Sequence, residues 1–261
     1  MALRREPHVL VVGGSDSSGG AGIACDIETI SSLGVRTCLA VTAVTVQTHE
    51  AVRDIRHLQP GLVADQMRAA LQANQVAAIK IGMLATAEIV VAVADVLREN
   101  PHVPAVLDPV LASTSGRALL EAGAIAVMKR NLMPLCRLVT PNLIELALLV
   151  GAELAVDEDG AVWQGQGLLA AEAQALLIKG GHASGSRSTD ILLRFDQAPV
   201  RFDMPRLATS MRGTGCMLAS AIAAHLAKAS PLEDSVRKGK RFVFEKLQNT
   251  RPAVKGPACL S

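Results

Sequence analysis

The amino-acid sequence predicts one α/β domain in which helices cover both faces of a mostly parallel sheet. Short apolar runs alternate with longer amphipathic stretches along the chain, which is typical of βα units. Hydrophobic residues make up 50% of the 261 residues, which provides for a large core and excludes a disordered chain. No break in composition would serve as a linker. We therefore predict one domain over residues 1–250, followed by a loosely ordered, proline-containing tail over residues 251–261.

Apolar runs bounded by turn residues predict the strands, and apolar periodicity near 3.6 predicts the helices. The expected strands are His8–Val12, Thr37–Val44, Ala77–Met83, Ala105–Val110, Arg137–Thr140, Ala175–Gly180, and a hairpin of Asp190–Phe195 with Val200–Asp203. The expected helices are Gly20–Ser32, Gly61–Ala73, Ala87–Arg98, Ala118–Lys129, Asn142–Val150, Leu168–Gln174, Gly215–Lys228 and Leu232–Gln248. Glycine or proline lies at several of these boundaries, including Gly13, Gly34 and Pro141, and each breaks the preceding pattern.

The composition argues against several classes of partner. A net charge of +2 and an aromatic content of 2% disfavour a nucleic-acid binder, which usually needs a basic stripe or stacking residues. No apolar run reaches the roughly 18 residues of a membrane span, and the apolar stretch after the N-terminus is too short for a signal peptide. The five cysteines are scattered and form no metal-binding motif, which favours a reducing, cytoplasmic compartment.

Unusual loops follow most of the predicted parallel strands. They are GGSDSSGGAG (13–22), GML (82–84), DPV (108–110), TPN (140–142) and KGGH (179–182), and RGTGC (212–216) opens a late helix. Ligands of open parallel sheets bind outside the carboxyl ends of the strands, next to helix N-termini. Five glycines in ten residues at 13–22 favour close approach of a substrate, although a flexible turn is the alternative.

The RGTGC loop has the features of a phosphate cradle. Gly213 and Gly215 permit close backbone approach, and the first N–H groups of the following helix point at an anion. The loop is not a Walker A motif, and dinucleotide binding is disfavoured because no GxGxxG occurs in the chain's first glycine-rich loop. A tight helix cap is the alternative. Cys216, at this helix N-terminus, would have a favoured thiolate or else be a small packing residue.

Charged residues near these strand ends have two interpretations each. Asn142 and Glu145 lie on one helix face and could hold hydrated Mg²⁺, but the spacing alone favours a capping box. Lys179 ends a buried strand and should face a charged ligand or a carboxylate, unless it extends to the surface. Asp108 follows an apolar run and could touch a metal or cap a helix.

Taken in order, these segments resemble the ribokinase-like superfamily, and within it the hydroxymethylpyrimidine/phosphomethylpyrimidine kinase family. The pieces GSDSSGGAGI, TAVTVQ, KIGML, LDPV, TPNLIE, IKGGH and GTGC occur at family-like spacings over roughly residues 8–246. The resemblance implies a three-layer α/β/α fold, a homodimer, and Mg-ATP-dependent phosphorylation of 4-amino-5-hydroxymethyl-2-methylpyrimidine and then its monophosphate, in thiamine biosynthesis. A pyridoxal or pyridoxine kinase and a catalytically weak pyrimidine-binding domain are the alternatives.

The resemblance also implies roles for individual residues. Those of the pyrimidine pocket are Gly14, Asp26, Gln47, Met83 and Val110; those of the Mg-phosphate side are Asn142, Glu145 and Asp108; those contacting ATP are Lys179, Gly213, Gly215 and Lys240. Cys216 takes the position of the catalytic residue. The chemistry agrees, because an amide at Gln47 can pair with an aminopyrimidine edge and Asp26 can accept from its amine.

The chain departs from the family pattern at positions near the expected site. Ala24 replaces a glutamine, Thr114 replaces a lysine, and Arg212 replaces a histidine, while Thr48 and His49 alter the pocket rim. The changes at 114 and 212 both fall near the expected phosphate path. Arg212 could restore the lost positive charge as a bidentate phosphate contact, or the changes could alter substrate range or weaken activity.

Overall fold

The computed structural model describes residues 6–113, 116–181, 185–209 and 211–250. Their strands form one nine-stranded sheet in the order β3-β2-β1-β4-β5-β6-β7-β8-β9. The strands are β1 (His8–Ser15), β2 (Arg36–Gln47), β3 (Val52–His57), β4 (Val76–Ile81), β5 (Ala105–Leu107), β6 (Leu138–Val139), β7 (Ala175–Ile178), β8 (Arg187–Arg194) and β9 (Val200–Pro205). The six strands from β2 to β7 pair in parallel, and β3, β8 and β9 add antiparallel edges.

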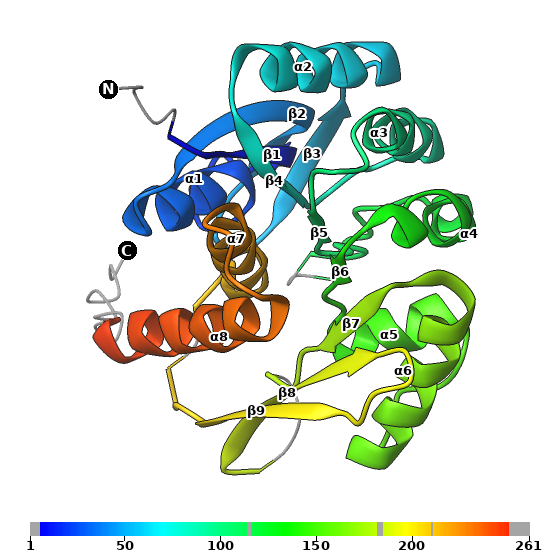
Figure 1. Cartoon of the computed structure of the whole chain (residues 1–261), viewed down its shortest axis with the longest axis vertical. Helices are drawn as coiled ribbons and strands as arrows, with labels where there is room; N and C mark the ends of the chain where they lie inside the picture. Colours follow the sequence, from blue (N-terminus) through cyan, green and yellow to red (C-terminus); the bar gives the residue numbers. More distant parts are fainter. Residues whose placement is uncertain (1–5, 114–115, 182–184, 210, 251–261) are drawn as a thin grey trace, which may run out of the picture.

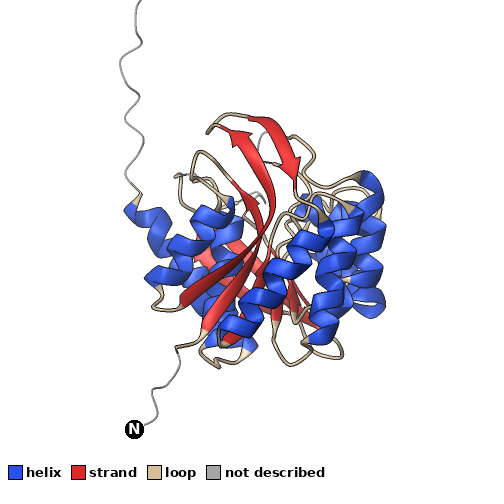
Figure 2. Ribbon diagram, turned by 90° about the horizontal axis from the view of Figure 1, so that it is seen from above, coloured by secondary structure: helices blue, strands red, loops and turns tan. Residues whose placement is uncertain are grey.

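Helices cover both faces of this sheet, as the sequence predicts (Figures 1 and 2). One layer holds α2 (Pro60–Ala73), α3 (Ala87–Glu99), α4 (Ala122–Asn131), α5 (Leu143–Val150) and α6 (Glu158–Glu172); the other holds α1 (Gly22–Ser32), α7 (Thr214–Ala227) and α8 (Leu232–Asn249). Along β1, Leu10 and Val12 pack into the first layer, whereas Val9 and Val11 pack into the second. Because successive side chains of a strand point to opposite faces, a fully apolar strand serves both cores.

The structure differs from the predicted elements in two main places. Strand β3 was not predicted, because its sequence VRDIRH is polar and only Val52 is buried. Helix α6 begins ten residues before the predicted start at Leu168. Gly165 explains part of this difference. A Cβ there would lie 2.6 Å from Leu193 Cδ1 and 2.8 Å from Ile178 Cδ1, so close packing of the helix on the sheet needs glycine. Glycine is a poor helix former, which weakens the helical pattern of the sequence around it.

Other boundaries differ by a few residues. Helix α4 begins at Ala122 rather than Ala118, and β5 and β6 are shorter than expected. The predicted tail at 251–261, the departure at Thr114, and His182 of the KGGH segment lie outside the described residues. The division into one domain over 1–250 stays a prediction. Within the part of the chain that the structure describes, no helix is long and apolar enough to span a membrane.

Candidate active site

One cavity of about 530 Å³ lies against the loops that follow the parallel strands. All the residues that the sequence assigned to a site line this cavity: Gly14, Asp26, Gln47, Met83, Asp108, Val110, Asn142, Glu145, Lys179, Arg212, Gly213, Gly215, Cys216 and Lys240. They come from segments as far apart as α1 and α8. The carboxyl ends of parallel strands meet at one edge of a sheet, which is why loops distant in sequence converge here. The roles of the individual residues stay predictions.

The N-terminus of α7 borders the cavity as the predicted cradle. Its N-cap residue is Gly213, with φ 75°, and a Cβ at this position would lie 2.5 Å from the carbonyl oxygen of Gly20. The Cys25 thiol donates to the Gly213 carbonyl from 3.7 Å. A Cβ on Gly215 would lie 3.3 Å from Lys179 Nζ. Glycine is therefore required at 213 for helix docking, and the unused N–H groups of the first turn offer a site for an anion.

Lys179 joins two carboxylates on the cavity floor. Its Nζ lies 2.7 Å from Asp108 Oδ1 and 3.5 Å from Glu145 Oε2. The prediction that Lys179 faces a carboxylate is confirmed. Although burial opposes ionisation of Asp108, Lys179 and Lys80 hold the pKa of this carboxyl below its ordinary value. Burial raises the pKa of Glu145, with Lys179 acting in the opposite direction.

Asn142 and Glu145 form the capping box that their spacing favoured. Asn142 Oδ1 accepts from the Glu145 backbone N–H at 2.8 Å, and Glu145 Oε2 accepts from the Asn142 N–H at 2.8 Å. The same Glu145 oxygen faces Lys179, so the cap also places a carboxylate in the cavity. The described residues bring no three His, Cys, Asp or Glu side chains together as a metal cluster.

A buried ion pair that sequence reasoning missed lies beside the cavity. Lys80, on β4, is 1% exposed, and its Nζ lies 2.8 Å from Asp26 Oδ2. Ser220 donates to the other Asp26 oxygen at 2.7 Å. Asp26 was expected to accept from the substrate amine, but both of its oxygens already accept hydrogen bonds from the protein. The signal in the sequence was the single lysine inside the apolar run VAAIKI.

A third lysine–aspartate pair lies at the far end of the cavity. Lys240 Nζ is 2.9 Å from Asp190 Oδ2, and Asp190 Oδ1 accepts from the Gly180 N–H at 3.0 Å. Asp190 was not predicted, because its strand was assigned only to a hairpin. The pairs Asp26–Lys80, Asp108–Lys179 and Asp190–Lys240 are called here the three lysine–aspartate pairs. Each neutralises a charge that would be costly to bury alone.

Cys216 does not have the favoured thiolate that its place at a helix N-terminus suggested. The residue is half-buried in the cavity wall. Loss of water around the thiol raises the pKa of Cys216 to about 12, Asp108 and Asp26 add to this effect, and Lys80 opposes it. Desolvation therefore outweighs the helix dipole, whose contribution is about 0.3–1 kcal/mol at ordinary exposure. The thiol is neutral at physiological pH.

The opposite end of the cavity combines an apolar surface with an amide. Met83 packs with Ala43 and Ala85, and Val110 lies against them. A Cβ on Gly14 would lie 3.0 Å from Met83 Sδ, so glycine leaves room for this side chain. Thr45 Oγ1, which donates to the Ser15 carbonyl at 2.8 Å, also lies 3.2 Å from Gln47 Oε1. This end fits a flat heterocycle with polar edges.

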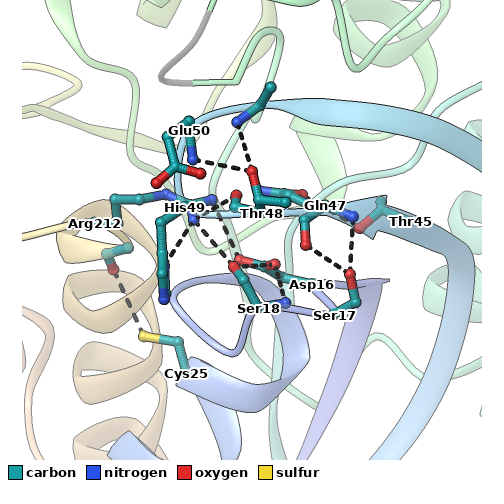
Figure 3. Close-up of polar contacts among 12 residues, drawn as sticks. Asp16, Ser17, Ser18, Cys25, Thr45, Gln47, Thr48, His49, Glu50 and Arg212 are labelled. Atoms are coloured by element: carbon teal, nitrogen blue, oxygen red, sulfur yellow. Dashed lines mark hydrogen bonds and ion pairs between the residues drawn. The ribbon is translucent and has the colours of Figure 1, made fainter. Parts of the chain in front are cut away.

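Arg212 does not extend toward the cradle that follows it in sequence. Its guanidinium contacts residues from the 13–22 loop and from the turn after β2, as Figure 3 shows. Nη2 lies 3.3 Å from Asp16 Oδ2, and Nη1 donates to Ser18 Oγ and to the Thr48 carbonyl, each at 3.1 Å. The predicted phosphate contact is not tested by these bonds, but the protein already supplies the guanidinium with an anion.

The chain belongs to the phosphomethylpyrimidine kinase family, whose model matches residues 16–258. It is 41% identical over 90% of its length to a hydroxymethylpyrimidine/phosphomethylpyrimidine kinase of Rhizobium meliloti, of which it covers 88%. The crystal structure of phosphomethylpyrimidine kinase from Clostridium difficile is 30% identical, with a TM-score of 0.79 over 93% of this chain and 99% of that one. Pyridoxal kinase of Bacillus subtilis, solved with ADP, is 25% identical, with a TM-score of 0.87 over 95% and 94%. The predicted family and fold are thereby confirmed.

Proposed function

We propose that this protein transfers the γ-phosphoryl group of ATP to the hydroxymethyl group of 4-amino-5-hydroxymethyl-2-methylpyrimidine, and then to the resulting monophosphate. The observation that carries the proposal is one cavity with two unlike ends. One end presents Gln47 beside Met83, and the other presents the N-terminus of α7 beside Lys179. An acceptor and a triphosphate can therefore meet in one place. Holding two reactants in line supplies much of the rate enhancement of a phosphoryl transfer.

The nucleotide would lie along α7 and α8. Beyond the cradle the cavity is lined by the apolar side chains Met204, Met211, Val243, Phe244 and Leu247, which suit a purine base. The backbone N–H groups of Gly213 and Gly215 would donate hydrogen bonds to phosphate oxygens, and Lys179 lies close to Gly215. Lys240, paired with Asp190, lies at this end and would contact the nucleotide.

The donors present fit a hydrated Mg²⁺ that is shared with the nucleotide. Mg²⁺ prefers oxygen ligands and is usually bound by one or two carboxylates together with substrate phosphates. Asp108 and Glu145 would supply these carboxylates, and Lys179 contacts both of them. When bound there, the metal would neutralise charge on the phosphates. Asn142 would fix the position of Glu145 through the capping box.

Cys216 would act on the acceptor hydroxyl without being a strong base. Its raised pKa leaves a neutral thiol that can orient the hydroxyl by a weak hydrogen bond. A loose phosphoryl-transfer transition state needs little deprotonation of the nucleophile before bond formation. The thiol would therefore be a positioning group at the point of transfer.

A pyridoxal kinase is the second candidate. The solved pyridoxal kinase of Staphylococcus aureus, in complex with pyridoxal, is 27% identical to this chain, with a TM-score of 0.86. An ancestral protein described as preceding both kinds of vitamin kinase is 29% identical. Pyridoxal also carries a hydroxymethyl group on an aromatic ring, so the apolar end of the cavity suits it. The amide of Gln47 favours the aminopyrimidine.

The experiment is a coupled assay of ADP formation with three acceptors: the aminopyrimidine alcohol, its monophosphate and pyridoxal. We expect kcat/KM for the aminopyrimidine to exceed that for pyridoxal by at least about tenfold. A higher value for pyridoxal would support the second candidate. Turnover of ATP with none of the three, together with pyrimidine binding in calorimetry, would support a binding domain.

We further propose that the protein works in the cytoplasm as a homodimer in thiamine biosynthesis. The cysteines within the described residues, Cys25, Cys38, Cys136 and Cys216, are free, which suits a reducing compartment. A curated relative from Geobacter sulfurreducens, 40% identical, is a bifunctional protein of thiamine biosynthesis, and this chain spans 52% of it. The family resemblance supports the dimer, and sedimentation of the purified protein tests it.

A further inference from the structure

We propose that Arg212 is a positioning residue that ties the acceptor end of the cavity to the phosphate cradle. The proposal rests on the proposed function, because it assigns Arg212 to the alignment of the two reactants. It concerns a position at which this chain has arginine where the family pattern has histidine. The guanidinium bridges the 13–22 loop and the turn after β2, while its backbone leads directly into the N-terminus of α7 (Figure 3).

The contact with Asp16 is the strongest part of this bridge. The Asp16 side chain is 4% exposed and that of Arg212 is 22% exposed. Asp16 Oδ1 accepts from Ser18 N–H at 2.9 Å and from Ser18 Oγ at 2.7 Å, which leaves Oδ2 for Arg212 at 3.3 Å. Exposed ion pairs contribute little, but loss of one partner of a buried pair leaves an uncompensated charge. Arg212 is therefore needed to neutralise the carboxylate of Asp16, which is almost completely buried.

The same guanidinium also fixes the segment that carries Gln47. Arg212 Nη1 donates to the carbonyl of Thr48, the residue directly after Gln47, and lies 3.4 Å from His49 Nδ1. Ser17 Oγ donates to the Gln47 carbonyl at 2.8 Å and accepts from the Gln47 N–H at 2.8 Å. Ser17 thus holds the backbone of Gln47 and Arg212 holds the next residue, so we expect movement of Arg212 to shift the side-chain amide of Gln47.

The cradle is attached to the other end of this bridge. Gly213 follows Arg212 and packs so closely on Gly20 that a Cβ would lie 2.5 Å from the Gly20 carbonyl oxygen. Gly20 in turn leaves room for the arginine, because a Cβ there would lie 3.3 Å from Arg212 Nη1. We therefore expect Arg212 to set the distance between the side-chain amide of Gln47 and the first turn of α7. An error of about 1 Å in such a separation can slow a transfer by about 10²-fold.

The position of the guanidinium distinguishes this role from a phosphate contact. Its hydrogen-bonding partners are Asp16 and Ser18 in the 13–22 loop and Thr48 and His49 in the turn after Gln47, and none belongs to α7. A direct contact with ATP predicts a loss in ATP binding when Arg212 is replaced. A positioning role predicts a loss in acceptor KM and in kcat, with ATP binding nearly unchanged.

The experiment compares Arg212→Met, Arg212→Lys, Asp16→Asn and the double variant Asp16→Asn/Arg212→Met with the parent enzyme. Arg56→Met is the matched control, because Arg56 forms an exposed pair with Asp54 and does not line the cavity. We measure kcat, KM for each substrate, and the binding of a non-hydrolysable ATP analogue. Hydrogen–deuterium exchange of the segments 13–22 and 44–50 gives a readout that is independent of activity.

We expect Arg212→Met to raise the acceptor KM at least tenfold and to lower kcat, while affinity for the ATP analogue stays within threefold. Arg212→Lys should recover part of the loss, because an ammonium can pair with Asp16 but cannot also span Ser18 and Thr48. The double variant should be no worse than the poorer single variant. Exchange should rise in both segments in Arg212→Met and remain unchanged in Arg56→Met.

Three results would overturn the proposal. They are a loss of ATP affinity as large as the loss in acceptor KM, additive effects in the double variant, and unchanged exchange in the two segments. An inactive parent enzyme with all three acceptors would contradict the proposed function instead, and the exchange measurement would still decide the role of Arg212. If the parent prefers pyridoxal, the same kinetic comparison applies with that acceptor.

Discussion

Lys80 Nζ lies 2.8 Å from Asp26 Oδ2, with both side chains only 1% exposed, at the wall of the cavity. A lysine this deeply buried is normally driven toward its neutral form. Here burial lowers the pKa of Lys80, but the carboxylates of Asp26 and Asp108 outweigh it and hold this pKa above its ordinary value. Burial raises the pKa of Asp26, and Lys80 and Ser220 act in the opposite direction. Lys80 is therefore the cation that stabilises the charged form of Asp26, and it lies near the thiol of Cys216.

Removal of either member of this pair should cost more stability than removal of both. Lys80→Met leaves Asp26 as an unpaired buried carboxylate, and we expect a loss of about 3–5 kcal/mol in the free energy of unfolding. Lys80→Met/Asp26→Asn should recover at least about half of this loss. Urea denaturation measures both, with the exposed Arg68–Glu99 pair as control through Arg68→Met. Equal losses in the single and double variants would contradict an ionised pair.

Glu145→Gln separates the capping role of Glu145 from its proposed role toward Mg²⁺. Glutamine keeps an oxygen that can accept from the Asn142 N–H, so stability should change by less than about 1 kcal/mol. The loss of charge should raise the Mg²⁺ concentration needed for half-maximal rate and lower kcat. Glu121→Gln is the control, because Glu121 is an exposed N-cap residue of α4 outside the cavity. An unchanged Mg²⁺ titration would remove Glu145 from the metal site.

Cys216 should react slowly with alkylating reagents in the native protein. With a pKa of about 12 against 9.0 for an ordinary thiol, its thiolate fraction at pH 8 is lower by about 10³-fold. Iodoacetamide labelling followed by peptide mass analysis should therefore show far slower modification in native than in unfolded protein.

The same pKa makes a prediction for stability in alkali. The unfolded thiol ionises near pH 9 whereas the folded one keeps its proton, so the folded state loses stability as the pH rises from 9 toward 12. Cys216→Ser should reduce this loss, as measured by thermal unfolding across that range. In the labelling experiment, rapid alkylation of the native protein at pH 8 would contradict the raised pKa of Cys216.

Gln47→Leu should weaken acceptor binding selectively. The substitution keeps apolar volume but removes the donor and acceptor that are proposed to pair with the heterocycle, and an unpaired buried polar group costs about 1–3 kcal/mol. Affinity for the aminopyrimidine, measured by calorimetry, should fall more than tenfold, while affinity for ATP stays within about twofold. A parallel loss of both affinities would place Gln47 outside the acceptor site.

Sequence patterns predicted most of the parallel sheet, and the residues that they assigned to a site line one cavity. Strand ends such as Asp108 and Lys179 can be assigned to one edge because parallel strands converge there. The pattern does not predict β3, because its residues are mostly polar and form a strand by pairing with β2. It also missed most of α6, where Gly165 serves packing against the sheet rather than helix propensity.

Pairwise contacts across the cavity were less accessible to sequence reasoning. Lys80 and Asp26 are 54 residues apart, and no local spacing links them. Desolvation of the thiol also opposed the expectation for Cys216, because a helix N-terminus is visible in sequence whereas the groups that pack around the thiol are not. Asp190 shows the same limit, since its partners Lys240 and Gly180 lie on other elements.

The three lysine–aspartate pairs have a consequence for recombining this chain with its relatives. Asp26–Lys80, Asp108–Lys179 and Asp190–Lys240 occupy successive stretches of sequence that do not overlap. A chimera with crossovers at residues 81–107 and 180–189 therefore inherits both members of every pair from one parent. A crossover within residues 27–79 joins Asp26 of one parent to the residue at position 80 of another. Where the second parent has no lysine at position 80, chimeras of the first kind are expected to fold at a higher frequency than those of the second.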